Sequence, residues 1–162
     1  MSLTYLFCDS SFDPQHRHGF AAFLECHDLA AEPTIDAVRL TFFSDTNNTR
    51  LELQGVLLAL GGLADGTATH VFTDCANIPN LLERKERLQS AQFHNRKGRP
   101  LQNADLYQLF FAECRRLELT FHWLEGHKPA GERDVGDRIF ALVDKAARQK
   151  LRSYNKAHNL TR

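Results

Sequence analysis

The chain has 162 residues, of which 43% are hydrophobic, and this length and composition suit one globular domain with its own core. It contains no signal peptide and no apolar run of about eighteen residues, so we expect a water-soluble cytoplasmic protein that is neither secreted nor inserted in a membrane. Twenty basic and 20 acidic residues give a formal net charge of zero, which excludes a general electrostatic attraction to nucleic acid.

The cysteines indicate the redox compartment and the kind of scaffold, and the local runs of charge indicate which surfaces are basic. The four cysteines, Cys8, Cys26, Cys75 and Cys114, form no Cys-x-x-Cys pair, so we expect free thiols in a reducing compartment and no zinc or disulfide scaffold. Six basic residues and no acid occur from Lys145 to the end, and three more basic residues lie between Arg96 and Arg99. Such runs are ordinary solvated surface unless a phosphate-handling site lies beside them.

The first 42 residues predict three strands of an antiparallel meander. Leu3–Cys8 is apolar on both alternating faces, as expected of a central strand covered on both sides, and it ends at Asp9. Gly19–Cys26 reads as a second strand, and Val38–Phe42 alternates like a half-exposed third strand.

The stretch from Thr46 to Leu60 predicts the first helix, over residues 49–60. Its buried face is defined by four apolar residues at helical spacing: Leu53, Val56, Leu57 and Leu60. At about 100° per residue, Glu52 lies roughly 40° from Val56, so its carboxylate points along the boundary between core and solvent. Two interpretations stay open: Thr49 and Glu52 form a capping box, or Glu52 reaches a site on the surface that the helix packs against.

The rest of the chain predicts two more strands and three more helices. We expect a strand at His70–Thr73 followed by Asp74, a helix from Pro79 to about Leu88, a helix at Asn103–Leu117 capped by Asn103, a strand at Leu119–Leu124, a loop at Gly126–Gly131 and a last helix from about Asp134 to Arg152. The whole pattern predicts one mixed α/β domain without repeats or linkers.

Two of the expected strands end in an aspartate. If these strands are neighbours, Asp9 and Asp74 meet at one edge of the sheet, where α/β proteins place their sites. With Glu52 beside them, three like charges lie together, and such a cluster is costly unless a cation is present. Oxygen ligands favour Mg²⁺ or Mn²⁺, and two such ions about 4 Å apart are the usual device for phosphodiester hydrolysis.

The order and context of these motifs resemble the type 1 ribonucleases H, from Leu3 to about Lys150. The matching segments are Asn47–Leu53 (Asn-Asn-Thr-Arg-Leu-Glu-Leu), Thr73–Cys75 (Thr-Asp-Cys), Arg99–Tyr107 and Phe121–His127 (Phe-His-Trp-Leu-Glu-Gly-His). The resemblance implies a ribonuclease H-like fold, a mixed five-stranded sheet with helices on both faces. It implies a catalytic domain at residues 1–152 and leaves 153–162 as a basic C-terminal tail.

The resemblance also implies an activity and a site. The activity is metal-dependent cleavage of the RNA strand of RNA–DNA hybrids with two Mg²⁺ or Mn²⁺ ions, leaving 5′-phosphate and 3′-hydroxyl ends. The implied metal ligands and catalytic acids are Asp9, Glu52, Asp74 and Asp144; His127 would move protons or release product, and Asn48 and Ser11 would contact the substrate. Asn48 stands at the position of a family asparagine that contacts the 2′-hydroxyl of the RNA strand.

The chain departs from the family pattern in three places. Ser10 replaces the usual glycine after the first aspartate, and Glu83 and Glu86 dilute the basic handle that grips the hybrid in some members. The fourth acid has two candidates, because Asp137 has the usual spacing of about ten residues after the histidine, whereas Asp144 has the matching sequence context. We favour Asp144.

Three functions stay open at this stage. The first is hybrid-specific cleavage by a monomer that binds no membrane. The second is a nuclease of the same fold that acts on double-stranded RNA or DNA junctions, and the third is a non-catalytic hybrid-binding module. His127 is either a catalytic residue or an ordinary loop histidine.

Overall fold

A computed structural model describes residues 3–125 and 128–160 of the chain. Its strands are β1 (Thr4–Asp13), β2 (His18–Cys26), β3 (Arg39–Phe43), β4 (Ala68–Thr73) and β5 (Glu118–Trp123). Its α-helices are α1 (Asn48–Gly61), α2 (Asn77–Glu83), α3 (Lys85–Ser90), α4 (Ala104–Arg116) and α5 (Val135–Ala157), with short 3₁₀ helices at Ile35–Ala37 and Ala130–Glu132.

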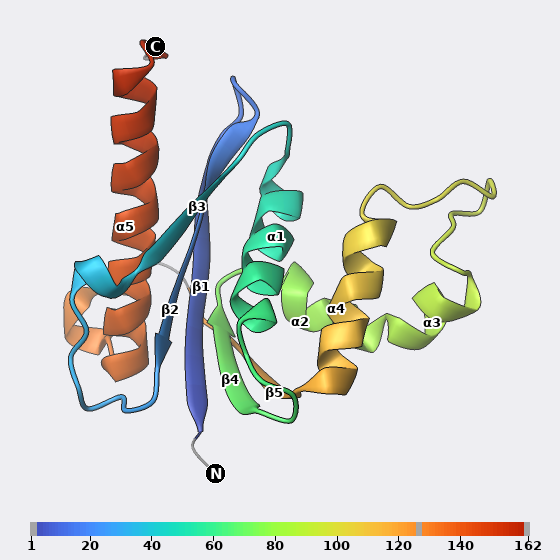
Figure 1. Cartoon of the computed structure of the whole chain (residues 1–162), viewed down its shortest axis with the longest axis horizontal. Helices are drawn as coiled ribbons and strands as arrows, with labels where there is room; N and C mark the ends of the chain where they lie inside the picture. Colours follow the sequence, from blue (N-terminus) through green and yellow to red (C-terminus); the bar gives the residue numbers. More distant parts are fainter. Residues whose placement is uncertain (1–2, 126–127, 161–162) are drawn as a thin grey trace.

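The five strands form one mixed sheet in the order β3-β2-β1-β4-β5. β1 pairs antiparallel with β2, and β2 with β3, whereas β4 runs parallel to both β1 and β5. Helix α5 covers one face of this sheet, and α1 to α4 lie on the other (Figure 1). The predicted fold class is therefore confirmed, and β1 and β4 are neighbours as the site prediction required.

Strand β1 is longer than the sequence pattern predicts. Its parallel pairing with β4 stops at Phe7 opposite Phe72, but its antiparallel pairing with β2 continues to Asp13 opposite His18. Asp9 consequently lies inside the strand, two residues beyond the last β4 pair. It still occupies the carboxyl end of the parallel part of the sheet, where β1 has lost its β4 neighbour.

Helix α1 begins one residue earlier than expected, and its cap is Asn47. The Asn47 side chain accepts a hydrogen bond from the Arg50 backbone N–H at 2.9 Å, so the capping box of Thr49 and Glu52 is wrong. An asparagine that satisfies a free N–H of the first turn stabilises a helix by about 1 kcal/mol. Glu52 is thereby left free of any capping role.

The helix expected from Pro79 to Leu88 is two helices. α2 ends at Glu83 and α3 begins at Lys85, with Arg84 between them at φ −94° and ψ 0°. Asn103 precedes α4 as expected, but its side chain makes no capping bond. It accepts a hydrogen bond from the Arg50 guanidinium at 3.2 Å instead, and this bond joins α4 to α1.

Helix α5 continues five residues past the predicted end at Arg152, so the expected boundary between domain and tail falls inside a helix. The continuation is explained by packing, because the Tyr154 ring stacks on Phe42 of β3 at 4.6 Å between centroids. Contact between half-buried aromatic rings stabilises a helix end that would otherwise fray.

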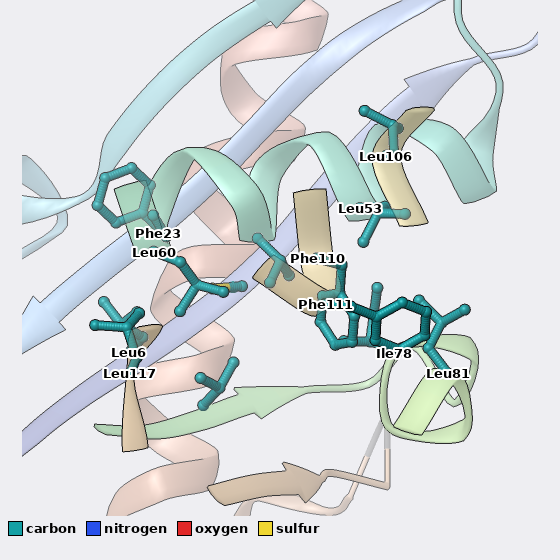
Figure 2. Close-up of a cluster of buried hydrophobic side chains, with 14 of the residues drawn as sticks. Leu6, Phe23, Leu53, Leu60, Ile78, Leu81, Leu106, Phe110, Phe111 and Leu117 are labelled. Atoms are coloured by element: carbon teal, nitrogen blue, oxygen red, sulfur yellow. The ribbon is translucent and has the colours of Figure 1, made fainter. Parts of the chain in front are cut away.

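The sheet has a hydrophobic core on each face. One core joins β1 and β4 to α1, α2 and α4, and Figure 2 shows how Leu53 and Leu60 of α1 converge with Phe110 and Phe111 of α4. Because Phe110 is fully buried, we expect its truncation to alanine to cost about 3–5 kcal/mol. The other core joins β1, β2 and β3 to α5.

All four cysteines are free thiols, as predicted. Among the described residues no helix combines the length and apolar character that crossing a membrane requires.

Candidate active site

Three acidic side chains converge from three different elements. Asp9 lies on β1, Glu52 on α1 and Asp74 directly after β4, and one carboxylate oxygen from each lies within 4.8 Å of the other two. The topology explains the meeting, since β1 and β4 are adjacent and α1 packs across β1. Asp9 is buried, with 5% of its surface exposed, whereas Asp74 is exposed. The cluster therefore opens to solvent on the Asp74 side.

The environment of Asp9 disfavours its ionised form. Burial raises the pKa of Asp9 well above its usual range, and the charges of Glu52 and Asp74 and contact with Asp144 raise it further. A hydrogen bond from the Ser10 backbone N–H lowers the pKa of Asp9, but by less than the other effects raise it. The Asp9 Oδ2 atom is buried and has no hydrogen-bond partner among the described residues. A buried carboxylate oxygen without a donor calls for a cation to stabilise its charge.

Glu52 is perturbed in the same direction. Burial raises the pKa of Glu52 to about 7; interaction with the Ser10 side chain opposes this rise, and the charge of Asp74 adds a smaller rise. Glu52 is consequently close to half protonated near neutral pH.

These residues fit a divalent metal ion of the oxygen-preferring kind. The three ligands are carboxylates, their charges repel one another, and the buried Asp9 Oδ2 atom lacks a donor. A bound dication would replace repulsion with attraction and supply the missing partner.

The structure separates the two candidates for the fourth acid. Asp144, on α5, contacts Asp9 and forms an ion pair with Arg148 at 2.8 Å. Asp137 instead completes a capping box at the start of α5: its backbone N–H donates to the Asp134 Oδ1 atom at 2.8 Å, and its Oδ2 atom accepts from the Asp134 N–H at 3.1 Å.

Lys128 also pairs with the same Asp137 oxygen at 3.3 Å. Although burial raises the pKa of Asp137, its hydrogen bonds with Asp134 and Lys128 lower it more, so the net pKa is below the usual value. Asp137 therefore caps the start of α5, whereas Asp144 is the candidate that contacts Asp9.

A pocket of about 310 Å³ lies between the start of α5 and the acid cluster. Its wall combines acids with four cations and is formed by Asp74, Leu124, Glu125, Lys128, Arg133, Asp137, Phe140, Ala141, Asp144, Lys145 and Arg148. Lys145 and Arg148 belong to the basic run that the sequence left as solvated surface. Arg133 was missed, because a lone arginine in a loop gives no sequence signal. Cations beside a carboxylate cluster suit a phosphodiester next to metal ions.

The remaining predicted residues belong to several parts of the chain. The Asn48 side chain is exposed at the first turn of α1, next to the capping Asn47, and Ser11 is half-buried in β1. His127, with its neighbour Gly126, lies outside the described residues. The basic segment from Arg96 to Arg99 is exposed in the loop that projects beyond α3 and α4 (Figure 1).

The sequence comparisons with known proteins agree on one protein family. A sequence model of the RNase H family matches residues 2–152. Ribonuclease H of Mycolicibacterium smegmatis is 28% identical over 101 residues, which cover 58% of this chain and 60% of that protein. Ribonuclease H of Nitratidesulfovibrio vulgaris is 29% identical over 119 residues, covering 71% of this chain and 72% of the relative. The chain thus spans about 60% of the length of several curated relatives that it matches.

Solved structures share the fold at low identity. A foamy viral protease-reverse transcriptase in complex with RNA/DNA hybrid superposes with a TM-score of 0.62 and 16% identity, covering 91% of this chain and 19% of that chain. A foamy viral protease-reverse transcriptase in complex with dsDNA gives a TM-score of 0.57 and 14% identity, covering 90% and 93%. At these identities the similarity concerns the fold alone.

Proposed function

The chain belongs to the RNase H family, whose sequence model matches residues 2–152, and on this premise we propose that it cleaves the RNA strand of RNA–DNA hybrids with the help of divalent metal ions. The products would carry 5′-phosphate and 3′-hydroxyl ends. The observation that supports this most strongly is the convergence of Asp9, Glu52 and Asp74 within 4.8 Å beside a pocket lined with cations.

The proposed ligands of two Mg²⁺ or Mn²⁺ ions are Asp9, Glu52, Asp74 and Asp144. When bound, such ions supply activation of water and stabilisation of the leaving oxygen. Because burial and mutual repulsion raise the pKa values of Asp9 and Glu52, ion binding would drive protons off both carboxyls. Metal affinity should therefore increase with pH across the neutral range.

The other side chains would position the substrate. Lys128, Arg133 and Lys145 line the pocket and would contact phosphate oxygens next to the scissile bond. Arg148 pairs with Asp144 and would hold that carboxylate toward Asp9. Asn48, exposed at the start of α1, would contact 2′-hydroxyls in the minor groove, which is how proteins distinguish RNA from DNA. The proposed roles of Ser11 in substrate contact and of His127 in proton transfer or product release derive from the family resemblance.

Free thiols and the absence of a membrane-spanning helix among the described residues suit a cytoplasmic enzyme. We propose that it acts there as a monomer, since all the acids of the proposed site come from one chain. Gel filtration at the concentration used for kinetics tests this part.

A cleavage assay tests the function. Labelled RNA–DNA hybrid, double-stranded RNA and double-stranded DNA of one sequence are incubated with the protein in Mg²⁺, in Mn²⁺ or in chelator. We expect metal-dependent cutting of only the RNA strand of the hybrid. Equal cutting of double-stranded RNA would favour the broader nuclease, and binding without cutting would favour a non-catalytic module.

The variant Asp9→Asn is the matched test of the site. It keeps the size of the side chain but removes the charge, so turnover should fall by orders of magnitude while hybrid binding survives in part. Near-normal turnover by a folded Asp9→Asn protein would remove Asp9 from the mechanism.

A further inference from the structure

A second cluster of metal-ligating side chains lies where the β1–β2 hairpin meets the end of α5, near the top of Figure 1. Asp13 ends β1, His16 lies in the turn and His18 begins β2, and one ligand atom from each lies within 4.8 Å of the other two. Within residues 3–125 and 128–160, only this group and the nuclease acids bring three such side chains together. Asn155, which contacts the cluster, lies about 16 Å along α5 from Asp144, so the two sites are separate.

The carboxylate of Asp13 is oriented by the backbone of the turn. Its Oδ1 atom accepts hydrogen bonds from the N–H groups of Gln15 at 2.9 Å and His16 at 3.3 Å. Its Oδ2 atom is thereby directed at the two imidazoles, 2.7 Å from His16 Nδ1 and 3.7 Å from His18 Nε2. One carboxylate oxygen thus faces a nitrogen of each ring.

The surroundings hold this arrangement in place. Asp13 is 8% exposed and His18 is 6% exposed. The Asn155 amide donates to Asp13 Oδ2 at 3.0 Å, and its oxygen lies 2.7 Å from His18 Nε2. The rings of His16 and His18 lie side by side, 5.6 Å between centroids and 16° from parallel. Ligands that are buried and already oriented lose little entropy when they bind an ion.

The spacing of the three atoms suits a tetrahedral ion. Zinc binds imidazole nitrogen and carboxylate oxygen at about 2.0–2.1 Å, which puts neighbouring ligand atoms about 3.3–3.4 Å apart in a tetrahedron. The distances of 2.7 Å and 3.7 Å from Asp13 Oδ2 to the two nitrogens lie on either side of this value. Lengthening the shorter distance by about 0.6–0.7 Å and shortening the longer one by about 0.3–0.4 Å would make room for the ion. The larger shift falls on His16, which is partly exposed and can move.

We propose that Asp13, His16 and His18 form a zinc site, with His16 Nδ1, His18 Nε2 and Asp13 Oδ2 as ligands and water in the fourth position. Two imidazoles and one carboxylate suit zinc, whereas the oxygen-only nuclease cluster suits Mg²⁺. Asn155 keeps its hydrogen bond to Asp13 Oδ2 and positions that ligand. The hydrogen bonds of His16 Nδ1 with Asp13 and of His18 Nε2 with the Asn155 oxygen would be given up on binding, and each imidazole would carry its proton on the other ring nitrogen. The ion would cross-link the two ends of the β1–β2 hairpin, and the hydrogen bond from Asn155 to Asp13 would connect this hairpin to the far end of α5.

The alternative role of the same residues is a hydrogen-bonded anchor between the hairpin and α5. Calorimetric titration of the tag-free protein with Zn²⁺, in excess Mg²⁺ to occupy the nuclease acids, distinguishes the two. We expect one Zn²⁺ per chain and an affinity at least about tenfold weaker in His16→Gln. His94→Gln, at an exposed histidine of the basic loop, is the matched control and should bind as the wild type does.

Two further measurements identify the site. Long-range ¹H–¹⁵N spectra should show Zn²⁺ shifting the Nδ1 signal of His16 and the Nε2 signal of His18, and Asp9→Asn should retain this binding. Absence of Zn²⁺ binding at micromolar concentration would overturn the proposal. Binding that is unchanged in His16→Gln, or that is lost in Asp9→Asn, would overturn it as well, because the ion would then sit elsewhere.

Discussion

Replacing Glu52 with glutamine should make the metal-free protein more stable, although Glu52 belongs to the proposed active site. The pKa of Glu52 is raised to about 7, mainly by burial, from an ordinary value of about 4.5. Because the folded value lies above the unfolded one, the stabilising contribution is fully present below about pH 4.5 and is lost as pH rises through about 7. A shift of about 2.5 units at 1.36 kcal/mol per unit makes this loss at most about 3.4 kcal/mol.

The glutamine cannot ionise, so the variant avoids this loss. Removing the charge of Glu52 also removes one cause of the raised pKa of Asp9, and this relief acts in the same direction. We therefore expect the advantage of Glu52→Gln over wild type to be less than about 1 kcal/mol at pH 5 and about 1–3 kcal/mol at pH 8. The range allows for partial exposure of the carboxyl and for the lost interaction with Ser10.

Urea unfolding in chelator at pH 5, 6.5 and 8 measures this difference. Added Mg²⁺ should reverse the order at pH 8, because preferential binding to the folded wild type stabilises it and the variant has lost a ligand. Glu86→Gln, at an exposed acid of α3, is the control and should show no such pH dependence. A Glu52→Gln protein that is no more stable than wild type at pH 8 in chelator would refute the electrostatic reasoning.

Three further outcomes are expected from paired variants. Asp144→Asn should reduce hybrid cleavage by orders of magnitude, whereas Asp137→Asn should lower the unfolding free energy by about 1 kcal/mol through its capping box and leave most of the turnover; the reverse ranking in a cleavage assay would contradict the assignment. Asn47→Ala should cost about 1 kcal/mol of stability, measured by urea unfolding, whereas Asn48→Ala should leave stability unchanged and raise the KM for hybrid. Gly55→Ala should lower the unfolding free energy by about 1–2 kcal/mol, because its Cβ would lie 2.8 Å from a side chain of β2 and this overpacking outweighs the gain of up to about 1 kcal/mol in helix propensity. An unchanged or higher melting temperature would count against that close contact.

The sequence predicted the elements whose pattern is set locally. Four residues at helical spacing were predicted to form the buried face of α1; Leu53, Val56 and Leu60 are buried, whereas Leu57 is only partly buried against the same core. The adjacency of β1 and β4 was a condition of the site prediction, and it holds because the two apolar strands are buried between helices on both faces. The convergence of Asp9 and Asp74 then follows from topology alone.

Features that depend on distant partners could not be predicted in the same way. β1 extends to Asp13 because β2 pairs with it there, and α5 extends to Ala157 because the Tyr154 ring stacks on Phe42. The cluster of Asp13, His16 and His18 was overlooked for the same reason. The sequence shows two histidines in a turn, but their ordering depends on Asn155, 137 residues after His18.

The choice between Asp137 and Asp144 depends on where α5 begins relative to β1. The two acids are seven residues apart, so they share one edge of the helix and lie about 10 Å apart along it. Spacing from the loop therefore cannot decide which one reaches Asp9. The position of the helix is fixed by its core contacts, since Val143 and Ala147 pack in the same cluster as Phe7 of β1, two residues before Asp9.

Sliding α5 by one turn, about 5.4 Å, would withdraw Val143 from that cluster. Losing a fully buried valine contact costs about 1.5–3 kcal/mol. A single bound ion could offset a loss of this size only at a concentration far above its Kd. The register of α5, and with it the proposal of Asp144 as the fourth acid, is thus set by apolar packing before any metal ion binds.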